Sequence, residues 1–320
     1  MSGSAELIAD RGEAAANEEF FRSRPFLDAE QVTHTLRIEA EGAELLAPLI
    51  VRGIPDSDRR DAISPYGYPG LAAAAGVDQR IVRADPDTAP DPERIDFSAT
   101  GLVSIFIRHA LGDPPLAGAV ERNVVQVADP ELPPKSRPSD RNQINRNRRA
   151  GYEVRIVAGP ETGAADRDGF RAAYAQTMRR ASAAGRYLFP DAYFDRILES
   201  ERSWLVLADA PDAAIAAGSI VAQSDGFLHY YLSGSTDAHL RDSPMKNLVA
   251  GLLELAGERR LPLNLGGGIS RGDRLEEFKR GFANREQTWS TSEIICDTET
   301  YEALSAGRPS TGFFPAYRAS

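Results

Sequence analysis

Short runs of apolar residues, many of them alternating with polar ones, are separated along the chain by turns that contain Gly, Pro, Asp and Ser. Runs of this length and composition predict β-strands. In the first half of the chain they cover residues 33–38, 45–51, 101–109 and 123–127. In the second half they cover residues 153–157, 204–208, 215–223, 227–234, 263–265 and 288–296. The turn Ser224-Asp225-Gly226 predicts a hairpin between the two strands that flank it.

Apolar residues at helical spacing occur between some of these strands, and each group shares one face of a predicted helix. The groups are Phe170, Tyr174 and Met178; Leu248, Leu252 and Leu255, in a helix that begins at Ser243-Pro244; and Leu275, Phe278 and Phe282, in a helix that begins near Asp273. A strand, an acidic turn and a second strand follow one another at residues 37–51 and again at 205–221. This pattern suggests two copies of a mixed α/β unit rather than one continuous doubly wound sheet.

The length of 320 residues suffices for two domains that each bury a core, and 42% hydrophobic with 26% charged residues is typical of globular proteins. A Pro-rich connector at residues 129–138 is the best candidate for a boundary, because proline stiffens a linker and cannot continue a strand ladder. We therefore expect a flexible segment at residues 1–25, a first domain at 26–138 and a second domain at 139–320.

Composition excludes several classes of function. No apolar run approaches the roughly 20 residues of a membrane-spanning helix, and the N-terminal sequence lacks the pattern of a secretory signal. A single cysteine and four histidines without a paired spacing predict no metal site. The net charge is 37 − 47 = −10, so DNA is not an expected partner. We expect a cytoplasmic protein with no cofactor.

One segment is strongly basic, although the chain as a whole is acidic. Residues 135–149, KSRPSDRNQINRNRR, contain six basic residues and one Asp. Such a run is either a solvated helix between domains or a binding surface for RNA phosphates. In the second case we expect the contacts to come from Arg141, Arg146, Arg148 and Arg149.

Three stretches of the sequence together resemble one family. Residues 243–285, SPMKNLVAGLLELAGERRLPLNLGGGISRGDRLEEFKRGFANR, contain a Pro-Met-Lys helix start, a Leu-Gly-Gly-Gly turn and a Phe-Lys-x-Gly-Phe element. Residues 64–70, SPYGYPG, form a Tyr- and Gly-rich loop, and RNQINRNRRAGYEVRI joins a basic helix to a strand. In order and spacing these stretches resemble the FemABX-like transferases, which are double-module members of the GNAT acyltransferase superfamily.

The resemblance implies two tandem GNAT-like domains, each a mixed, mostly antiparallel sheet flanked by helices (α/β, or α+β). It also implies an aminoacyltransferase, in which an amine acceptor attacks the ester of an aminoacyl-tRNA and a peptide bond forms. The acceptor would be a peptidoglycan precursor or a small amine of a specialised metabolite pathway. By the same resemblance Lys279 would stabilise the oxyanion and Phe278 would shape the pocket, with Tyr66 and Tyr68 in the loop of the first module binding substrate. The alternative for Lys279 is a solvated lysine paired with the neighbouring acids.

An acyl-CoA-dependent acetyltransferase of the same fold is the main alternative. Such enzymes cradle the pyrophosphate on the backbone N–H groups of a Gln/Arg-x-x-Gly-x-Gly/Ala helix start. Here the corresponding residues are Arg241-Asp242-Ser243-Pro244-Met245-Lys246, which lack the glycines and include a proline without an N–H. CoA is therefore disfavoured, although Arg241 and Lys246 remain suited to another phosphate. A catalytically inactive RNA- or protein-binding module of the same fold is the third possibility.

The remaining candidates are less specific. The triple glycine at 266–268 is neither a P-loop nor a dinucleotide fingerprint; Gly266, Gly267 and Gly268 are either a simple turn or a backbone that leaves room for substrate. Asp273 lies next to the motifs and is the candidate catalytic carboxylate. His229 and Tyr231 share one face of a strand, where they line the cleft or pack in the core.

Overall fold

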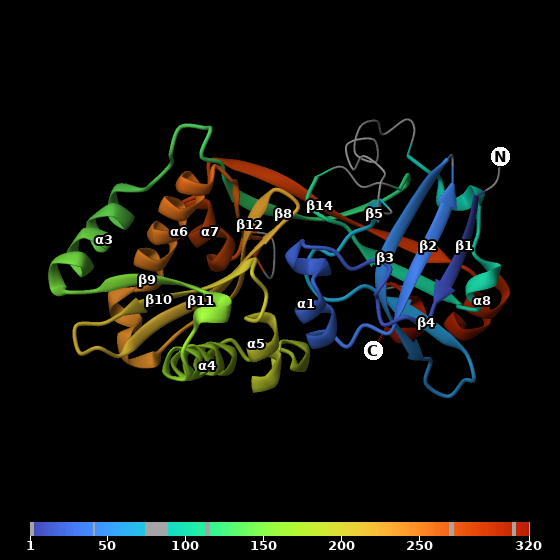
Figure 1. Ribbon diagram of the computed structural model, residues 1–320, viewed down its shortest axis with the longest axis horizontal. Coiled ribbons are helices and arrows are strands. Elements are labelled where there is room, and N and C mark those ends of the chain that lie inside the picture. Colours follow the sequence, from blue (N-terminus) through green and yellow to red (C-terminus); the bar gives the residue numbers. More distant parts are fainter. Residues whose placement is uncertain are drawn as a thin grey trace. The chain divides into compact units, whose positions relative to one another are not determined.

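The computed structural model of the protein describes residues 3–40, 42–73, 89–112, 116–268, 272–308 and 312–319 (Figure 1). The chain divides into two compact units. Unit 1 comprises Met1–Asn17, Phe21–Arg122 and Thr288–Ser320, and unit 2 comprises Glu18–Phe20 and Asn123–Gln287. The division falls inside two long strands, β8 (Val120–Ala128) and β14 (Arg285–Ile295).

Unit 1 is a mixed sheet with the strand order β6-β1-β2-β3-β4-β7-β14, and β5 pairs with β3. Its pairs are antiparallel except β1 with β6 and β4 with β7. The elements are β1 (Gly3–Ile8), α1 (Arg24–Ala29), β2 (His34–Ala40), β3 (Ala43–Gly53), β4 (Arg60–Ile63), β5 (Ala72–Ala73), β6 (Ile95–Asp96), β7 (Ser104–Arg108) and α8 (Thr298–Ser305). Buried aliphatic side chains of β2, β3 and β7 form the centre of its core.

Unit 2 is a sheet with the order β8-β13-β12-β11-β10-β9, antiparallel except for β12 with β13. Its strands are β9 (Glu153–Ala158), β10 (Ser203–Asp209), β11 (Ile215–Ser224), β12 (Phe227–Ser235) and β13 (Leu263–Gly266). Its helices are α3 (Pro138–Ala150), α4 (Ala164–Arg180), α5 (Asp191–Ile197), α6 (Met245–Arg259) and α7 (Arg274–Arg280).

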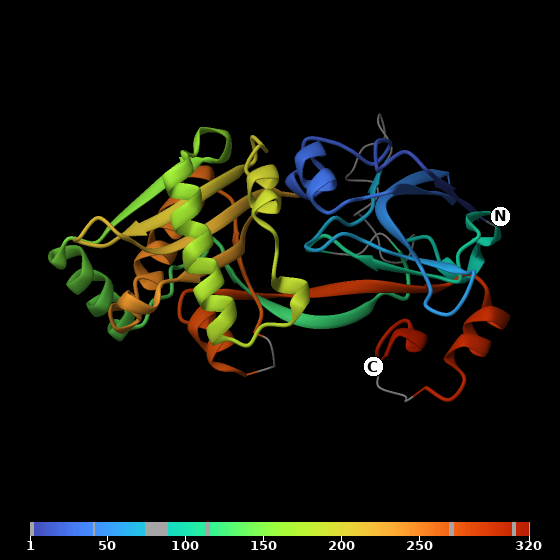
Figure 2. The same cartoon turned by 90° about the horizontal axis from the view of Figure 1, so that it is seen from below.

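Helices cover both faces of the unit 2 sheet. Successive residues of β11 point to opposite faces: Ala217 packs in the core cluster that α6 fills, whereas a Cβ on Gly218 would lie 2.9 Å from the ring of Phe170 on α4. Figure 2 shows α4 lying across its face of the strands. The other face carries α6, against which α3 packs in turn.

The fold class predicted from the sequence is confirmed. Both sheets are mixed, mostly antiparallel and flanked by helices. The predicted hairpin of β11 and β12 turns at Asp225 and Gly226, whose φ angles of 51° and 80° are left-handed. A turn of this kind twists in the same sense as the two strands it joins.

The division into units differs from the predicted boundary at residue 138. The Pro-rich connector is tied to unit 2, because Asn284 donates hydrogen bonds to the carbonyl oxygens of Asp129 and Pro133 and α3 packs on α6. The first residues are not a flexible segment either, since β1 pairs with β2 over five residues. Only Ala5 of β1 is fully buried, so its sequence carries little hydrophobic signal.

A buried carboxylate ties the C-terminal segment to the unit 1 sheet. Asp61 on β4 is 0% exposed. Its Oδ1 accepts hydrogen bonds from Arg52 at 3.0 Å and from Arg318 at 3.0 Å, and its Oδ2 accepts one from the hydroxyl of Tyr317 at 3.2 Å. That hydroxyl also lies 2.8 Å from Ser104 Oγ. A buried charge with this many partners is very costly to leave without them.

We therefore expect Asp61→Asn to lower the free energy of unfolding by about 3 kcal/mol, because two guanidinium groups lose their shared counter-charge. The control is Asp58→Asn, whose carboxylate is 95% exposed and only 3.6 Å from Arg59; it should change stability by less than about 0.5 kcal/mol. Urea denaturation of both variants measures this. Equal stabilities would contradict the assigned role of Asp61.

Candidate active site

The strands β12 and β13 separate at the centre of unit 2. Among the described residues their parallel pairing consists of Leu228 with Leu263 and His229 with Asn264. Beyond this point Gly266 pairs with β8 through a register shift. In β12, Tyr231 is a bulge residue, because the β11 partners pass directly from Tyr230 to Leu232. A bulge of this kind locally interrupts the pairing of a strand and redirects its side chains.

The glycine turn after β13 is shaped by close neighbours. Gly266 has a φ of 78°, and a Cβ there would lie 3.1 Å from Lys279 Nζ. A Cβ on Gly267 would lie 2.7 Å from the side-chain amide of Asn123. The space that these glycines leave is thus taken up by Lys279 and Asn123. A role of Gly266, Gly267 or Gly268 in binding substrate stays a prediction.

Lys279 on α7 is turned inward. Its side chain is 8% exposed, and Nζ donates a hydrogen bond to the carbonyl oxygen of Gly267 at 2.7 Å. Burial disfavours the ammonium and lowers the pKa of Lys279 to about 8, while the negative charge of Asp273 acts in the opposite direction. The alternative of a solvated lysine is therefore wrong.

The predicted apolar stripe of α7 is only partly correct. Phe282 is buried, and Phe278 packs against the same core with its ring 5.4 Å from that of Phe282. Leu275, however, is 41% exposed. The inward face of this seven-residue helix carries Glu276 and Lys279 instead, so polar side chains occupy positions that the helical pattern assigned to leucine.

Two carboxylates stabilise the start of α7. Asp273 is the N-cap, and its Oδ1 accepts a hydrogen bond from the backbone N–H of Glu276 at 2.8 Å. The buried carboxylate of Glu276 accepts one from the N–H of Gly272 at 2.6 Å and pairs with Arg280. Because the carboxylate of Asp273 is already bound to the helix backbone, it is poorly placed to accept a proton from a substrate. Its negative charge nevertheless acts on Lys279.

His229 and Tyr231 do not line one surface. His229 is 2% exposed and lies between Ser224 and Asn264, and burial lowers its pKa to about 4, so the imidazole is neutral. His229 is therefore a core histidine, which was one of the two alternatives that the sequence allowed. The Tyr231 hydroxyl lies 2.8 Å from that of Tyr193 on α5, and its ring meets Phe20 edge to face.

The start of α6 is closed by protein groups. The N–H groups of Lys246, Asn247 and Leu248 donate to the carbonyl oxygens of Ser243 and Pro244, and Lys246 Nζ lies 2.9 Å from a carboxylate oxygen of Asp140 on α3. Just before α6, Arg241 is exposed on the 3₁₀ helix Asp237–Asp242. Of the two residues predicted to bind phosphate, Lys246 already has a counter-ion.

The basic segment forms α3. Its inner face consists of Asp140, Ile144 and Asn147, and the Asn147 amide donates to the Asp242 carbonyl at 2.7 Å and to Asn247 Oδ1 at 2.8 Å. All four predicted contact residues are exposed: Arg141, Arg146, Arg148 and Arg149. Arg141 donates to the Ser136 carbonyl and Arg148 pairs with Glu254.

The other two candidates belong to unit 1. Tyr68 packs edge to face on Phe21 and Trp289, with ring centroids 5.7 and 6.0 Å apart. The backbone N–H of Tyr66 donates to a carboxylate oxygen of Glu30 at 2.9 Å. The loop therefore forms part of the unit 1 packing, and a role in binding substrate stays a prediction.

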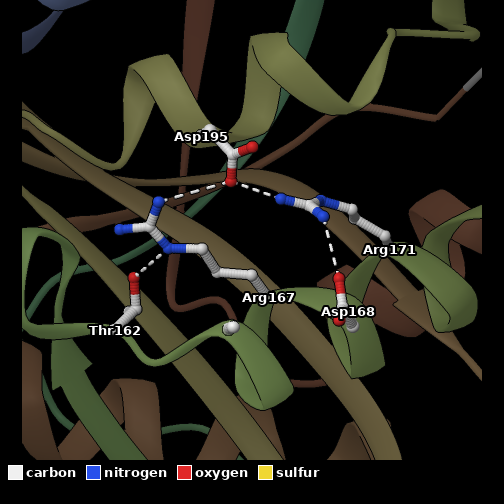
Figure 3. Close-up of a pocket in the computed structure, with 6 residues that line it drawn as sticks. Thr162, Arg167, Asp168, Arg171 and Asp195 are labelled. Carbon is white, nitrogen blue, oxygen red and sulfur yellow. Dashed lines mark hydrogen bonds and ion pairs between the residues drawn. The ribbon is translucent and has the colours of Figure 1, made fainter.

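A shallow hollow of about 410 Å³ lies between the start of α4 and α5. Figure 3 shows Arg167 and Arg171 converging on one oxygen of Asp195. Arg167 Nε also donates to Thr162 at 2.7 Å, and Arg171 pairs with Asp168 at 2.8 Å. Both guanidinium groups thus have carboxylate partners, and the cluster links the two helices.

Comparisons with known proteins give the domain family of part of the chain and its fold. Residues 134–280 match the model of the acetyltransferase (GNAT) domain family. This match shows a GNAT domain at residues 134–280. A structure of FemX aligns over 84% of this chain and 89% of its own, with a TM-score of 0.59 and 11% identity. No curated protein sequence matches the chain.

Two further GNAT-like neighbours support the same fold. The structure of L-PGS from Bacillus licheniformis aligns over 81% of this chain and 82% of its own, with a TM-score of 0.53 and 12% identity. The C-terminal domain of a putative lysylphosphatidylglycerol synthetase from Agrobacterium fabrum aligns over 89% and 91%, with a TM-score of 0.54 and 12% identity. The chain is thus a GNAT-fold acyltransferase.

None of the helices in the described part of the chain combines the length and the apolar character that a membrane span requires. Within the same residues, no group of three or more His, Cys, Asp or Glu side chains is arranged to hold a metal ion.

Sequence reasoning missed Asn264, Asp140 and Asn147, which are all buried polar residues of unit 2. Asn264 carries the clearest signal, because it lies between two leucines in a short buried strand. A polar side chain in such a place needs hydrogen-bond partners, which is a reason to search for a site there.

The pKa of Lys279 can be measured directly, because the chain has only three lysines, Lys135, Lys246 and Lys279. We expect the ¹³Cε signal of Lys279 to titrate near pH 8, since burial favours the neutral amine. Titration of Lys279 above pH 10 would contradict the buried position.

Proposed function

We propose that the protein transfers an aminoacyl group from aminoacyl-tRNA to an amine acceptor, either a small amine or a peptidoglycan precursor. The observation that carries this proposal is the inward position of Lys279, beside the glycine turn where β12 and β13 separate. The names of two structural neighbours, FemX and lysylphosphatidylglycerol synthetase, point in the same direction.

The reaction joins the acceptor nitrogen to the carbonyl carbon of the ester. The amine attacks, the carbonyl oxygen becomes an oxyanion, and the bond to the ribose oxygen then breaks. The nitrogen loses one proton and the ribose oxygen gains one. A buried ammonium stabilises the oxyanion more strongly than a solvated one would, because little water screens it. We assign this role to Lys279, and Phe278 then forms an apolar wall beside it.

Asp273 supports this role through its charge. The nearby carboxylate raises the pKa of Lys279 and so opposes the effect of burial. Below about pH 8 the lysine then remains an ammonium, which is the form that an oxyanion requires. We propose that Asp273 contributes to catalysis in this indirect way and that the proton of the attacking amine passes to another group of the acceptor or to water.

The start of α6 argues against acyl-CoA as the donor. A pyrophosphate would need free backbone N–H groups at this helix end. Three of them are engaged by Ser243 and Pro244, and Pro244 has none. Asp140 adds a carboxylate beside Lys246, which would repel a pyrophosphate.

The experiment that tests the function offers the protein a panel of charged tRNAs and acyl-CoAs with candidate amines, and reads the products by mass spectrometry. We expect an amide product from at least one charged tRNA and none from acyl-CoA. Acyl transfer from CoA alone would overturn the proposal and favour the acetyltransferase alternative. Salt-sensitive tRNA binding without any product would favour the inactive binding module.

Replacement of Lys279 tests its role. Lys279→Met keeps most of the side-chain volume and removes the charge, so single-turnover transfer should slow by about 10²–10³-fold while tRNA affinity changes little. Arg280 is a poor control, since it pairs with the buried Glu276. Arg274→Met on the exposed side of the same helix is better matched. Equal rates in the two variants would refute the assignment.

The exposed arginines of α3 are proposed to contact tRNA phosphates. Arg146→Glu with Arg149→Glu should weaken tRNA binding and lower the slope of log affinity against log salt by about one for each lost contact. The melting temperature should hardly change, because both side chains are exposed. Fluorescence anisotropy at several salt concentrations measures the affinity. Unchanged affinity for tRNA would mean that α3 is a solvated helix without a role in binding.

A further inference from the structure

Asn264 is a buried amide on β13 whose hydrogen bonds determine how it is oriented. Its Oδ1 accepts a hydrogen bond from the N–H of Gly266 at 2.8 Å. The Nδ2 group therefore points the other way, 3.1 Å from Nδ1 of His229. Because the amide nitrogen can only donate, Nδ1 must accept, and the imidazole proton is on Nε2. Nε2 lies 3.2 Å from the Ser224 carbonyl oxygen, which is an acceptor for that proton.

The neutral state of His229 agrees with this assignment. The side chain is 2% exposed, and burial lowers the pKa of His229 to about 4. A protonated imidazole would present a second donor to the Asn264 amide, and the amide would have to turn over and release Gly266. With the neutral ring, every polar atom along this line of hydrogen bonds has a partner.

The line of hydrogen bonds leads to Lys279. Gly266 is held in a left-handed conformation, with φ at 78°. The conformation of Gly266 sets the direction of the next carbonyl group, that of Gly267, which accepts the hydrogen bond from Lys279 Nζ at 2.7 Å. Asn264, Gly266 and Gly267 therefore connect the core histidine to the buried ammonium. The links from His229 to Asn264, from Asn264 to Gly266 and from Gly267 to Lys279 are hydrogen bonds, and a peptide bond joins the two glycines.

We propose that Asn264, oriented by His229, is a positioning residue that fixes the glycine turn against Lys279. Asn264 touches no reacting atom and acts through the Gly266 N–H. This positioning role depends on the proposed function in one respect, which is that Lys279 stabilises the oxyanion. A purely structural role for Asn264 would stabilise the fold without any particular effect on Lys279.

The test is the ¹³Cε titration of Lys279 in Asn264→Leu, without any substrate. Leucine is close in volume and lacks both hydrogen-bonding groups. The released turn should admit water to Nζ, and the pKa of Lys279 should rise by about one unit or more toward its ordinary value. The control is Val206→Ala, a buried change on β10, which lowers stability and should leave the titration in place. Equal titrations in the wild type and Asn264→Leu would overturn the proposal.

A second variant keeps the proposal testable if Asn264→Leu does not fold. Asn264→Asp retains the oxygen that accepts from Gly266 but replaces the donor by a carboxylate. Nδ1 of His229 must then carry a proton to donate to it, while Nε2 keeps its own proton for the Ser224 carbonyl oxygen. We expect the pKa of His229 to rise and that of Lys279 to stay near its wild-type value. A His229 that remains neutral at pH 6 in this variant would contradict the geometry.

These titrations also separate the two proposals. If the pKa of Lys279 shifts in Asn264→Leu but no charged tRNA yields product, the positioning role stands and the proposed function fails. If transfer occurs, Asn264→Leu should lower kcat about tenfold or more with little change in KM, because an oxyanion interaction acts in the transition state.

Discussion

The burial of one ammonium group sets the requirements for the rest of the site. A lysine removed from water is unfavourable unless its charge has partners. Lys279 has the Gly267 carbonyl at 2.7 Å and the negative charge of Asp273 nearby. The glycine turn must therefore come close to α7, which a side chain at 266 would hinder. The start of α7 must also be capped so that the helix holds the lysine in place.

Much of the fold could be predicted from the sequence, since strands rich in apolar side chains and a Ser-Asp-Gly turn are strong local signals. β11 and β12 were predicted nearly to their ends. Two features depend on distant contacts and were not predictable. β1 contributes only Ala5 to the fully buried core, and the unit boundary falls within strands β8 and β14 rather than in the Pro-rich connector.

The site was predictable mainly where a motif was present. The resemblance pointed to Lys279, and the structure places this residue against the triple glycine. The expectation for His229 and Tyr231 assumed regular alternation, which the bulge at Tyr231 interrupts. Lys279 points inward and Leu275 points outward because of the way α7 packs against β13. The hydrophobic pattern of a seven-residue helix is too short to predict this orientation. Asn264 was missed because its partner His229 lies 35 residues away in the sequence and meets it only in the folded sheet.

We propose that Lys279 meets the 3′ end of a charged tRNA, and affinity labelling can show whether it does. Periodate converts the terminal ribose of tRNA to a dialdehyde, which forms an imine with a neighbouring lysine that borohydride reduction makes permanent. With only three lysines in the chain, peptide mass spectrometry identifies the labelled one without ambiguity. We expect labelling of Lys279 that excess unmodified tRNA suppresses. Labelling confined to Lys135 or Lys246 would contradict it.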